Sequence, residues 1–243
     1  MATMTPPDTA IAVAVPEKRT PLVQLVWQGG TIIALVALIV IFGVLRPGAF
    51  LSLGNLTNVL AQVAILTIIA AAQTKVMVTG HFDLSVGTTA TLAGATASAL
   101  MLGGLPVPMA IVLGLLAGLV VGMVNGLLVA YLNISAIVAT LATMTTVGGL
   151  CFIVTDGTTL YGMPESFFWI GQSRPLGIPM PVIFAAVVAA IVWVVLRYTT
   201  VGRRWYAVGG NPEVARLSGI NVRSDVFWAF ALAGLASGLG GIV

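Results

Sequence analysis

Residues 108–131 of the chain read PMAIVLGLLAGLVVGMVNGLLVAY, without one charged side chain. A helix needs about 20 consecutive apolar residues to cross the hydrocarbon of a bilayer. The stretch belongs to a longer segment, between Asp83 and Asp156, in which no residue is charged. It therefore predicts a transmembrane helix, and its surroundings predict further ones.

The composition of the whole chain excludes a soluble enzyme. Hydrophobic residues make up 59% of the 243 residues and charged residues 7%, whereas a soluble domain has about 25% charged residues. A net charge of +3 forms no basic patch, so no nucleic-acid partner is expected. A single cysteine, Cys151, excludes an internal disulfide, and a single histidine, His81, excludes zinc sites built on paired histidines, so no metal site is expected.

The uncharged stretches predict an all-α fold, a polytopic transmembrane helix bundle of about seven spans. The ten-residue alternating segments of a membrane barrel are absent from the sequence. Turn clusters, such as the glycines and prolines at 103–108, divide the longest uncharged segment into three spans. The expected spans are 23–45, 57–78, 86–102, 108–131, 136–154, 181–196 and 226–243.

Arginine and lysine positions predict the orientation, because short cytoplasmic loops of membrane proteins are rich in these residues. A cytoplasmic N-terminus leaves only Arg46 and Arg174 on the outside. It places the other terminal and loop cations inside: Lys18, Arg19, Arg197, Arg203, Arg204, Arg216 and Arg223. We therefore expect a disordered cytoplasmic tail at 1–22 and a single transmembrane domain at 23–243. Its large cytoplasmic loop is 197–225, and its large external loop is 155–180.

Four glycines, Gly114, Gly118, Gly122 and Gly126, recur at every fourth residue and share one face of the helix predicted at 108–131. Small residues let the backbones of two helices approach closely in lipid, where no hydrophobic force brings them together. The spacing favours packing against another helix, with sliding during gating as the alternative.

A polar interruption at 73–85 separates two apolar runs and has two interpretations. It is either a cytoplasmic turn, in which Asp83 or Ser85 caps the next helix, or a broken helix that lines a substrate cavity. The second interpretation makes His81, Asp83, Ser85 and Asn125 candidate pathway residues. A further alternative is an ion-coupled secondary carrier with Lys75, His81 and Asp83 as its coupling site.

The loop at 201–221 contains a short helix with both ends marked. Asn211 is a good N-cap, Pro212 suits the first helical position, and Gly219 can end the helix in the left-handed conformation. Val214 and Leu217, three residues apart, form an apolar edge. A helix this short is not stable alone. The caps favour docking into the groove of a partner protein over simple attraction to anionic lipid.

This loop closely resembles the coupling loop of membrane permeases in ribose-type sugar importers of the ATP-binding-cassette class. Further resemblances are found at 79–87, 125–128, 140–144 and 177–179, in the family's order. His81-Phe82 stand where the family usually has Gly-Ile, the proline expected near Ser135 is absent, and the chain is C-terminally short for the family. The resemblance implies that the following residues couple the chain to an ATPase: Gly209, Gly210, Asn211, Pro212, Glu213, Val214, Ala215, Arg216, Leu217 and Gly219.

The resemblance also implies a function and a set of partners. The chain would be the permease subunit of a binding-protein-dependent importer, in the bacterial inner membrane, that moves a monosaccharide by alternating access. Its partners would be a cytoplasmic ATPase, which binds ATP and Mg, a second permease copy or homologous subunit, and an extracytoplasmic sugar-binding protein. The chain itself has no P-loop, so we expect no cofactor in it and no enzymatic activity. A non-transporting, truncated membrane scaffold remains an alternative.

Overall fold

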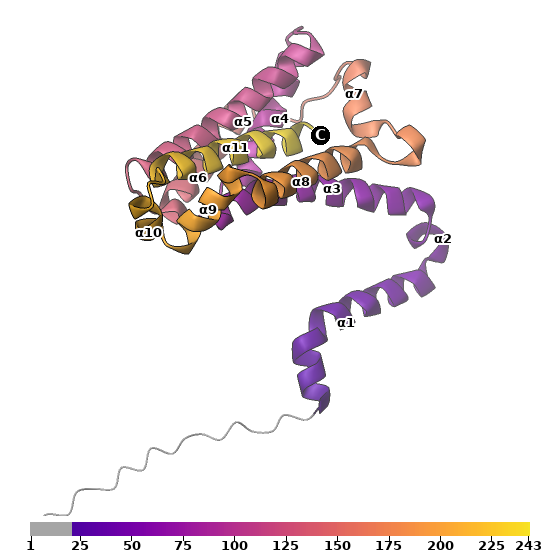
Figure 1. Ribbon diagram of the computed structural model, residues 1–243. Helices are drawn as coiled ribbons and strands as arrows, with labels where there is room; N and C mark the ends of the chain where they lie inside the picture. Colours follow the sequence, from indigo (N-terminus) through magenta and orange to yellow (C-terminus); the bar gives the residue numbers. More distant parts are fainter. Residues whose placement is uncertain (1–20) are drawn as a thin grey trace, which may run out of the picture. The chain divides into compact units, whose positions relative to one another are not determined.

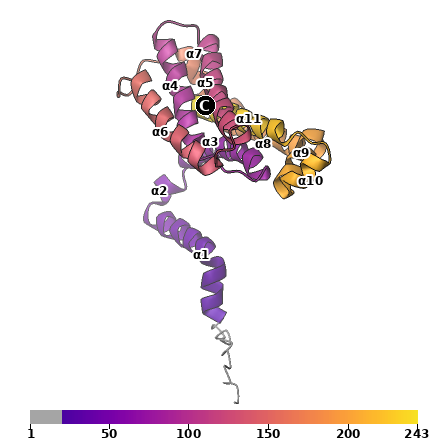
Figure 2. The ribbon, with the colours of Figure 1, turned by 90° about the vertical axis from the view of Figure 1, so that its left-hand side faces the viewer.

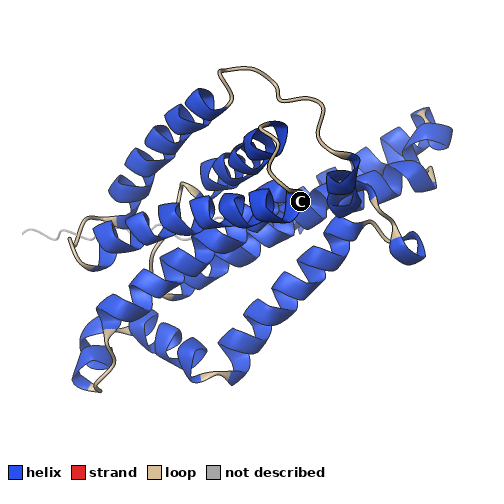
Figure 3. Cartoon of the chain, turned by 90° about the horizontal axis from the view of Figure 1, so that it is seen from above, coloured by secondary structure: helices blue, strands red, loops and turns tan. Residues whose placement is uncertain are grey.

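The computed structural model describes residues 21–243, and side chains from Gly29 onward. Among these residues every regular element is helical and none is a strand, which confirms the all-α prediction (Figure 3). The expected tail at 1–22 lies outside the described residues, except for its last two positions, which open the first helix. The helices are α1 (Pro21–Leu45), α2 (Pro47–Phe50), α3 (Leu53–Val78), α4 (Val86–Leu102), α5 (Val107–Ala130), α6 (Ala136–Val154), α7 (Glu165–Gln172), η1 (Pro175–Gly177), α8 (Met180–Tyr198), α9 (Thr200–Gly210), α10 (Pro212–Leu217) and α11 (Val222–Ile242).

Five of these helices are long and apolar enough to cross a membrane: α3, α5, α6, α8 and α11. Two further apolar helices are shorter, namely α4 and the part of α1 from Gly29 to Leu45. Each helix covers one of the expected spans to within a few residues. The polytopic bundle is therefore confirmed, while the count of seven crossings and the cytoplasmic N-terminus remain predictions.

The part of the chain that the structure describes divides into two compact units, one that ends at residue 55 and one from residue 56 to residue 243. In the first unit, Pro47 occupies the first turn of α2, and the rings of Phe42 and Phe50 stack with their centroids 5.8 Å apart. The second unit contains all the predicted site residues.

Helix α11 forms the centre of the second unit. Of the 18-residue apolar stretch that could cross the membrane, 61% is buried in α11, compared with 11% in α8. It packs against α5 and α4, and α6 packs on the α4–α5 side. On the opposite side, Ile68 of α3 and Ala185 of α8 form a buried cluster with the last turns of α11. Helices α9 and α10 lie at one end of this bundle, and α7 lies with the C-terminal residue at the other end (Figures 1 and 2).

Three of the four glycines in the α5 stripe, Gly118, Gly122 and Gly126, pack against α11, as the packing interpretation predicted. A methyl group at Gly118 would lie 2.7 Å from the carbonyl oxygen of Gly234, which is too close for any Cβ atom. Gly122 likewise faces the α11 backbone, near Phe230 and Gly234. Gly114 instead faces α4, because a methyl group there would lie 2.6 Å from the carbonyl oxygen of Ala93. Glycines on both helices therefore permit contact between backbones, which is the closest packing available to helices in lipid.

Candidate functional site

The short helix α10 has the caps that its sequence predicts. The side-chain oxygen of Asn211 accepts hydrogen bonds from the backbone N–H groups of Glu213 (3.0 Å) and Val214 (3.1 Å). At the other end, Gly219 takes a φ of +83°, and the N–H of Ile220 donates to the carbonyl oxygen of Ala215 (3.0 Å). Both ends therefore have their backbone groups satisfied, which fixes the geometry of a helix too short to be stable by itself.

One face of α10 is buried and the other is exposed. Ala215 is buried against the bundle, whereas Val214 and Leu217 are 56% and 79% exposed. Arg216 donates a hydrogen bond to Glu213 (2.5 Å) in an ion pair that is itself exposed. The exposed surface thus combines two apolar side chains with one charge of each sign, which is a composition suited to a protein partner.

Helix α9, which precedes α10, lies in a stretch expected to be loop. Its glycines and paired arginines indicate loop, but Trp205 and Val208, three residues apart, are fully buried against the bundle. Tertiary burial of this apolar face therefore stabilises a helix that the local composition does not favour. Gly209 permits close packing, because a side chain there would overlap the carbonyl oxygen of Val78 at the end of α3.

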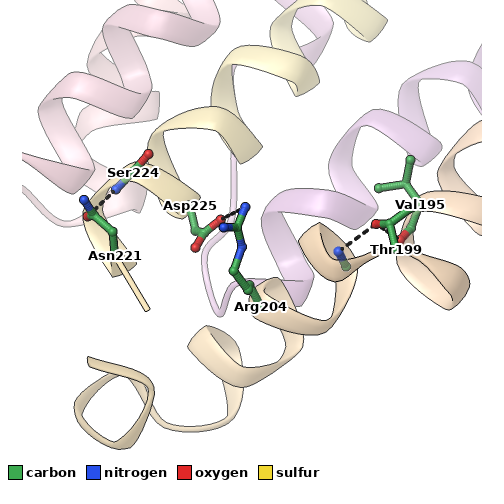
Figure 4. A network of polar contacts seen from close by, with 7 residues as sticks. Val195, Thr199, Arg204, Asn221, Ser224 and Asp225 are labelled. Atoms are coloured by element: carbon green, nitrogen blue, oxygen red, sulfur yellow. Dashed lines mark hydrogen bonds and ion pairs between the residues drawn. The ribbon is translucent and has the colours of Figure 1, made fainter. Parts of the chain in front are cut away.

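Polar contacts join α9 to its neighbours (Figure 4). The Thr199 hydroxyl oxygen caps α9 by accepting from the N–H of Gly202 (3.2 Å). Arg204 of α9 forms an ion pair with Asp225 of α11 (3.4 Å between Nη2 and Oδ1), and Asn221 caps α11 by accepting from the N–H of Ser224 (3.1 Å). Because α9 and α11 flank α10 in the chain, these contacts hold the short helix at both of its ends.

The polar interruption forms a turn at the same end of the bundle as α9. Gly80 takes a φ of +83°, and a methyl group there would lie 3.7 Å from the Cα of Gly209. One carboxylate oxygen of Asp83 accepts from both the backbone N–H (2.8 Å) and the hydroxyl (2.7 Å) of Ser85, just before α4. The local geometry is therefore that of a turn, but the expected cap of the next helix does not form. The Ser85 side chain makes no capping hydrogen bond to α4, and Asp83 bonds to Ser85, the residue before the helix.

This turn is held by side chains from three other helices. Asn125 of α5 donates to the Ser85 hydroxyl oxygen (2.8 Å) and, at 3.5 Å, to the second carboxylate oxygen of Asp83. Thr140 of α6 accepts from the N–H of Leu84 (3.1 Å), and the amide of Gln73 on α3 faces the backbone of Asp83. Burial raises the pKa of Asp83, against the opposing effect of the hydrogen bonds from Ser85 and Asn125. The network joins α3, α4, α5 and α6 through buried polar groups.

Of the four candidate pathway residues, three lie together and one lies apart. Asp83, Ser85 and Asn125 are buried in the network, at 3%, 0% and 0% exposure. His81 lines an open cavity of about 670 Å³ with residues 133–137 between α5 and α6. It also lines a second cavity, of about 290 Å³, together with Glu213 and Arg216 of α10. Burial lowers the pKa of His81, which favours the neutral imidazole.

The proposed ion-coupling residues do not form one site. The ammonium of Lys75 donates to the carbonyl oxygen of Leu232 on α11 (3.0 Å), whereas Asp83 bonds to Ser85 and Asn125. His81 lies near the Thr79 hydroxyl (3.4 Å) and forms an edge contact with the ring of Phe230. No ion pair joins Lys75 to Asp83 in the part of the chain that the structure describes. No cluster of metal-ligating side chains occurs there either.

Comparison with known proteins identifies the family. Residues 55–243 match the family described as branched-chain amino acid transport system / permease component. The ribose import permease protein of Bacillus subtilis is 40% identical over 216 residues, 88% of this chain and 67% of that protein. The corresponding protein of Haemophilus influenzae is 37% identical over 215 residues, 87% of this chain and 66% of that protein. The D-allose transport system permease protein of Escherichia coli is 32% identical over 229 residues, 93% of this chain and 70% of that protein.

The chain thus spans about two thirds of the length of these relatives. No solved structure matches it. The match to the family model covers every helix from α4 to α11 and most of α3, so it includes the whole packed bundle and the α9–α10 segment. Together with the apolar helices, these matches identify a multi-pass protein of the inner membrane. The chain belongs to the permease family of the branched-chain amino acid transport systems, within which it is similar to the ribose import permeases.

Proposed function

We propose that this chain is the permease subunit of a binding-protein-dependent, ATP-driven importer of a monosaccharide. The observation that carries the proposal is the exposed, doubly capped helix α10, which is held between α9 and α11 and presents Val214 and Leu217 to solvent. Such a surface suits docking of a separate cytoplasmic ATPase that binds ATP and Mg. The permease would then perform no bond chemistry and would translocate its substrate by alternating access.

The connections between α10 and the bundle support a role for α10 in transmitting movement of the ATPase to the spanning helices. Displacement of α10 by an ATPase would act on α11 through the short link at 218–221 and through the Arg204–Asp225 ion pair. Helix α11 is the most buried spanning helix and contacts α5 through backbone-to-backbone packing. A close-packed contact of this kind transmits displacement rather than absorbing it. Motion at the docking surface would therefore reach the centre of the bundle.

A monosaccharide substrate is supported by the names of the relatives, which include ribose and D-allose permeases. An extracytoplasmic sugar-binding protein would deliver the sugar at the end of the bundle that bears α7. A second copy of the permease, or a homologous subunit, would complete the translocation path. The 670 Å³ cavity beside His81 lies at the opposite end, where the substrate would leave toward the cytoplasm.

The test is co-purification of the ATPase subunit with which the chain is co-expressed. Leu217→Asp places a charge on the apolar docking face, and Glu213→Arg reverses a charge beside it. Each is expected to reduce the recovered ATPase at least about tenfold, the effect of losing about 1.4 kcal/mol of binding energy. Leu176→Asp is the matched control, because it makes the same substitution at a fully exposed leucine in the external loop.

The control variant is expected to retain the ATPase at the wild-type level. Equal recovery from Leu217→Asp and Leu176→Asp would contradict the docking role of α10. Sugar uptake by the purified chain, driven by a proton gradient without any ATPase, would overturn the proposal as a whole and support an ion-coupled carrier.

A further inference from the structure

A buried cation in α3 is not explained by the proposed transport cycle. Lys75 is 7% exposed, and its ammonium donates to one acceptor, the carbonyl oxygen of Leu232 (3.0 Å). An ammonium group has three donor hydrogens, and a charge within a membrane helix is costly unless an anion or water accompanies it. No carboxylate pairs with Lys75 among residues 29–243. Its counter-charge is therefore absent from the described chain.

Lys75 lines a cavity of about 340 Å³ between α8 and α11. Trp205 of α9 lines the same cavity, and its indole Nε1 is buried without an acceptor in the described part of the chain. Every other lining residue is aliphatic, including Val188, Leu232 and Leu239. The walls thus combine two side chains that have hydrogen-bond donors to spare with an apolar surface, and they have no acceptor side chain.

The donors lie at one end of the cavity. Lys75 is three residues before the end of α3, about 4.5 Å along the axis at 1.5 Å per residue, and Trp205 lies on α9 beyond the end of α8. Val188 and Leu239 lie farther along α8 and α11, toward the end of the bundle that bears α7. In the predicted orientation, the donors therefore lie at the cytoplasmic surface of the bilayer, and the apolar part extends toward its middle.

Another cavity, also of about 290 Å³ but distinct from the one that His81 and α10 line, shares Trp205 and Leu232 with the Lys75 cavity. It is lined by Arg204, whose side chain is 49% exposed, and by polar residues of the link to α11 and of its first turn. Among these is Asp225, the ion-pair partner of Arg204. A polar cavity in which Arg204 and Asp225 balance each other's charge therefore adjoins an apolar cavity that holds the unpaired cation of Lys75. This sequence of environments, from headgroup level to bilayer interior, is that of a phospholipid in the cytoplasmic leaflet, and basic pockets between helices on that side bind anionic headgroups.

We propose that the cleft between α8 and α11 is a binding site for an anionic phospholipid of the inner leaflet. The phosphate accepts hydrogen bonds from the Lys75 ammonium and the Trp205 indole, and one acyl chain lies along the aliphatic walls. The headgroup extends into the polar cavity beside Arg204. The lipid would supply the missing counter-charge and would fill the space between α8 and α11. The proposal does not depend on what the protein transports.

The test uses the full chain in detergent with equimolar dioleoyl phosphatidylglycerol and dioleoyl phosphatidylcholine, and native mass spectrometry measures the lipid retained. Wild type is expected to retain one phosphatidylglycerol in preference to phosphatidylcholine. Lys75→Met is expected to reduce the apparent affinity roughly tenfold or more, because a charge-assisted hydrogen bond is lost. Arg197→Gln is the matched control. It removes an exposed cation near the end of α8 that leads to α9, outside the cavity, and is expected to leave the affinity for phosphatidylglycerol unchanged.

A second variant protects the test against a folding defect in Lys75→Met. Ala236→Leu fills the apolar part of the cleft while leaving the cation in place, and it is expected to displace the lipid from a chain that remains monodisperse. Equal retention of the two lipids by wild type would overturn the proposal. Equal losses in Lys75→Met and Arg197→Gln would also overturn it, because they would indicate general attraction to the basic surface. Preferential retention of added oleate over phosphatidylglycerol would exclude a phospholipid as the occupant.

Discussion

The guanidinium of Arg204 lies 3.4 Å from the carboxylate of Asp225, and this ion pair links α9 to the first turn of α11. Its two side chains differ in environment, since that of Arg204 is 49% exposed and that of Asp225 is 8% exposed. The cost of breaking the pair therefore depends on which partner is removed.

Arg204→Met is expected to destabilise the chain by about 2 kcal/mol, because it leaves a buried carboxylate without a partner. Asp225→Asn is expected to cost less than about 1 kcal/mol, since water can solvate the remaining guanidinium. The double variant should be more stable than Arg204→Met alone, and thermal unfolding of the purified variants measures all three. Strictly additive losses would show that the two side chains do not interact.

The Asn211 cap of α10 gives a second prediction. Asn211→Ala removes the acceptor of two backbone N–H groups and is expected to cost about 1 kcal/mol, equivalent to roughly fivefold faster amide exchange in residues 212–217. Asn211→Asp keeps an acceptor and should exchange like wild type. The control, Asn221→Ala, should affect the start of α11 instead. Unchanged exchange in Asn211→Ala would mean that contacts with the bundle alone hold α10.

The glycine contact between α5 and α11 predicts a large effect of added volume. Gly118→Leu is expected to destabilise the bundle by about 3 kcal/mol or more, because the backbone of α11 occupies the space that the side chain needs. Gly148→Leu makes the same change in α6, at a position with no atom within 4 Å of the added Cβ. Its stability should equal or exceed that of wild type, since glycine is unfavourable inside a helix. Similar losses in the two variants, measured by thermal unfolding, would argue against backbone contact.

The Asp83 network predicts a dependence of stability on pH. Burial raises the pKa of the Asp83 carboxyl, so the folded chain holds this proton more tightly than the unfolded chain does. The resulting stabilisation is complete below the ordinary carboxyl pKa, near 3.9, and is lost as the pH rises through the raised value. The stability of wild type relative to Asp83→Asn should therefore fall as the pH is raised from about 4 to 7. Parallel curves for the two proteins would contradict the prediction.

The orientation is tested by labelling single cysteines in a Cys151→Ser background. Ser218→Cys, at the end of α10, should react with a membrane-impermeant thiol reagent only from the cytoplasmic side. Leu176→Cys, at a fully exposed position near α7, should react only from outside. The reverse pattern would invert the predicted topology.

The positions of helices could be predicted from the sequence where they depend only on the residues of the segment itself. The uncharged stretches located the spanning helices, because length and hydropathy alone decide whether a segment can cross a bilayer. The caps of α10 were also predictable, since Asn211, Pro212 and Gly219 each satisfy a requirement of the adjacent backbone. Helix α9 was not predictable, because its stability comes from burying Trp205 against the bundle.

The candidate site shows the same division. The polar residues at 73–85 could be identified from the sequence, because burying polar groups between apolar helices costs free energy. Their hydrogen-bond partners could not be identified in this way. Only the tertiary structure separates Lys75, which bonds to α11, from Asp83, which bonds to Ser85 and α5. The glycine stripe likewise predicted a close contact without specifying α11 as the neighbour. Sequence alone thus determined which segments are helices and which residues are costly to bury, because those properties depend on the nearest residues along the chain. Pairing between helices depends on the mutual fit of surfaces distant in sequence, and only the folded structure decides it.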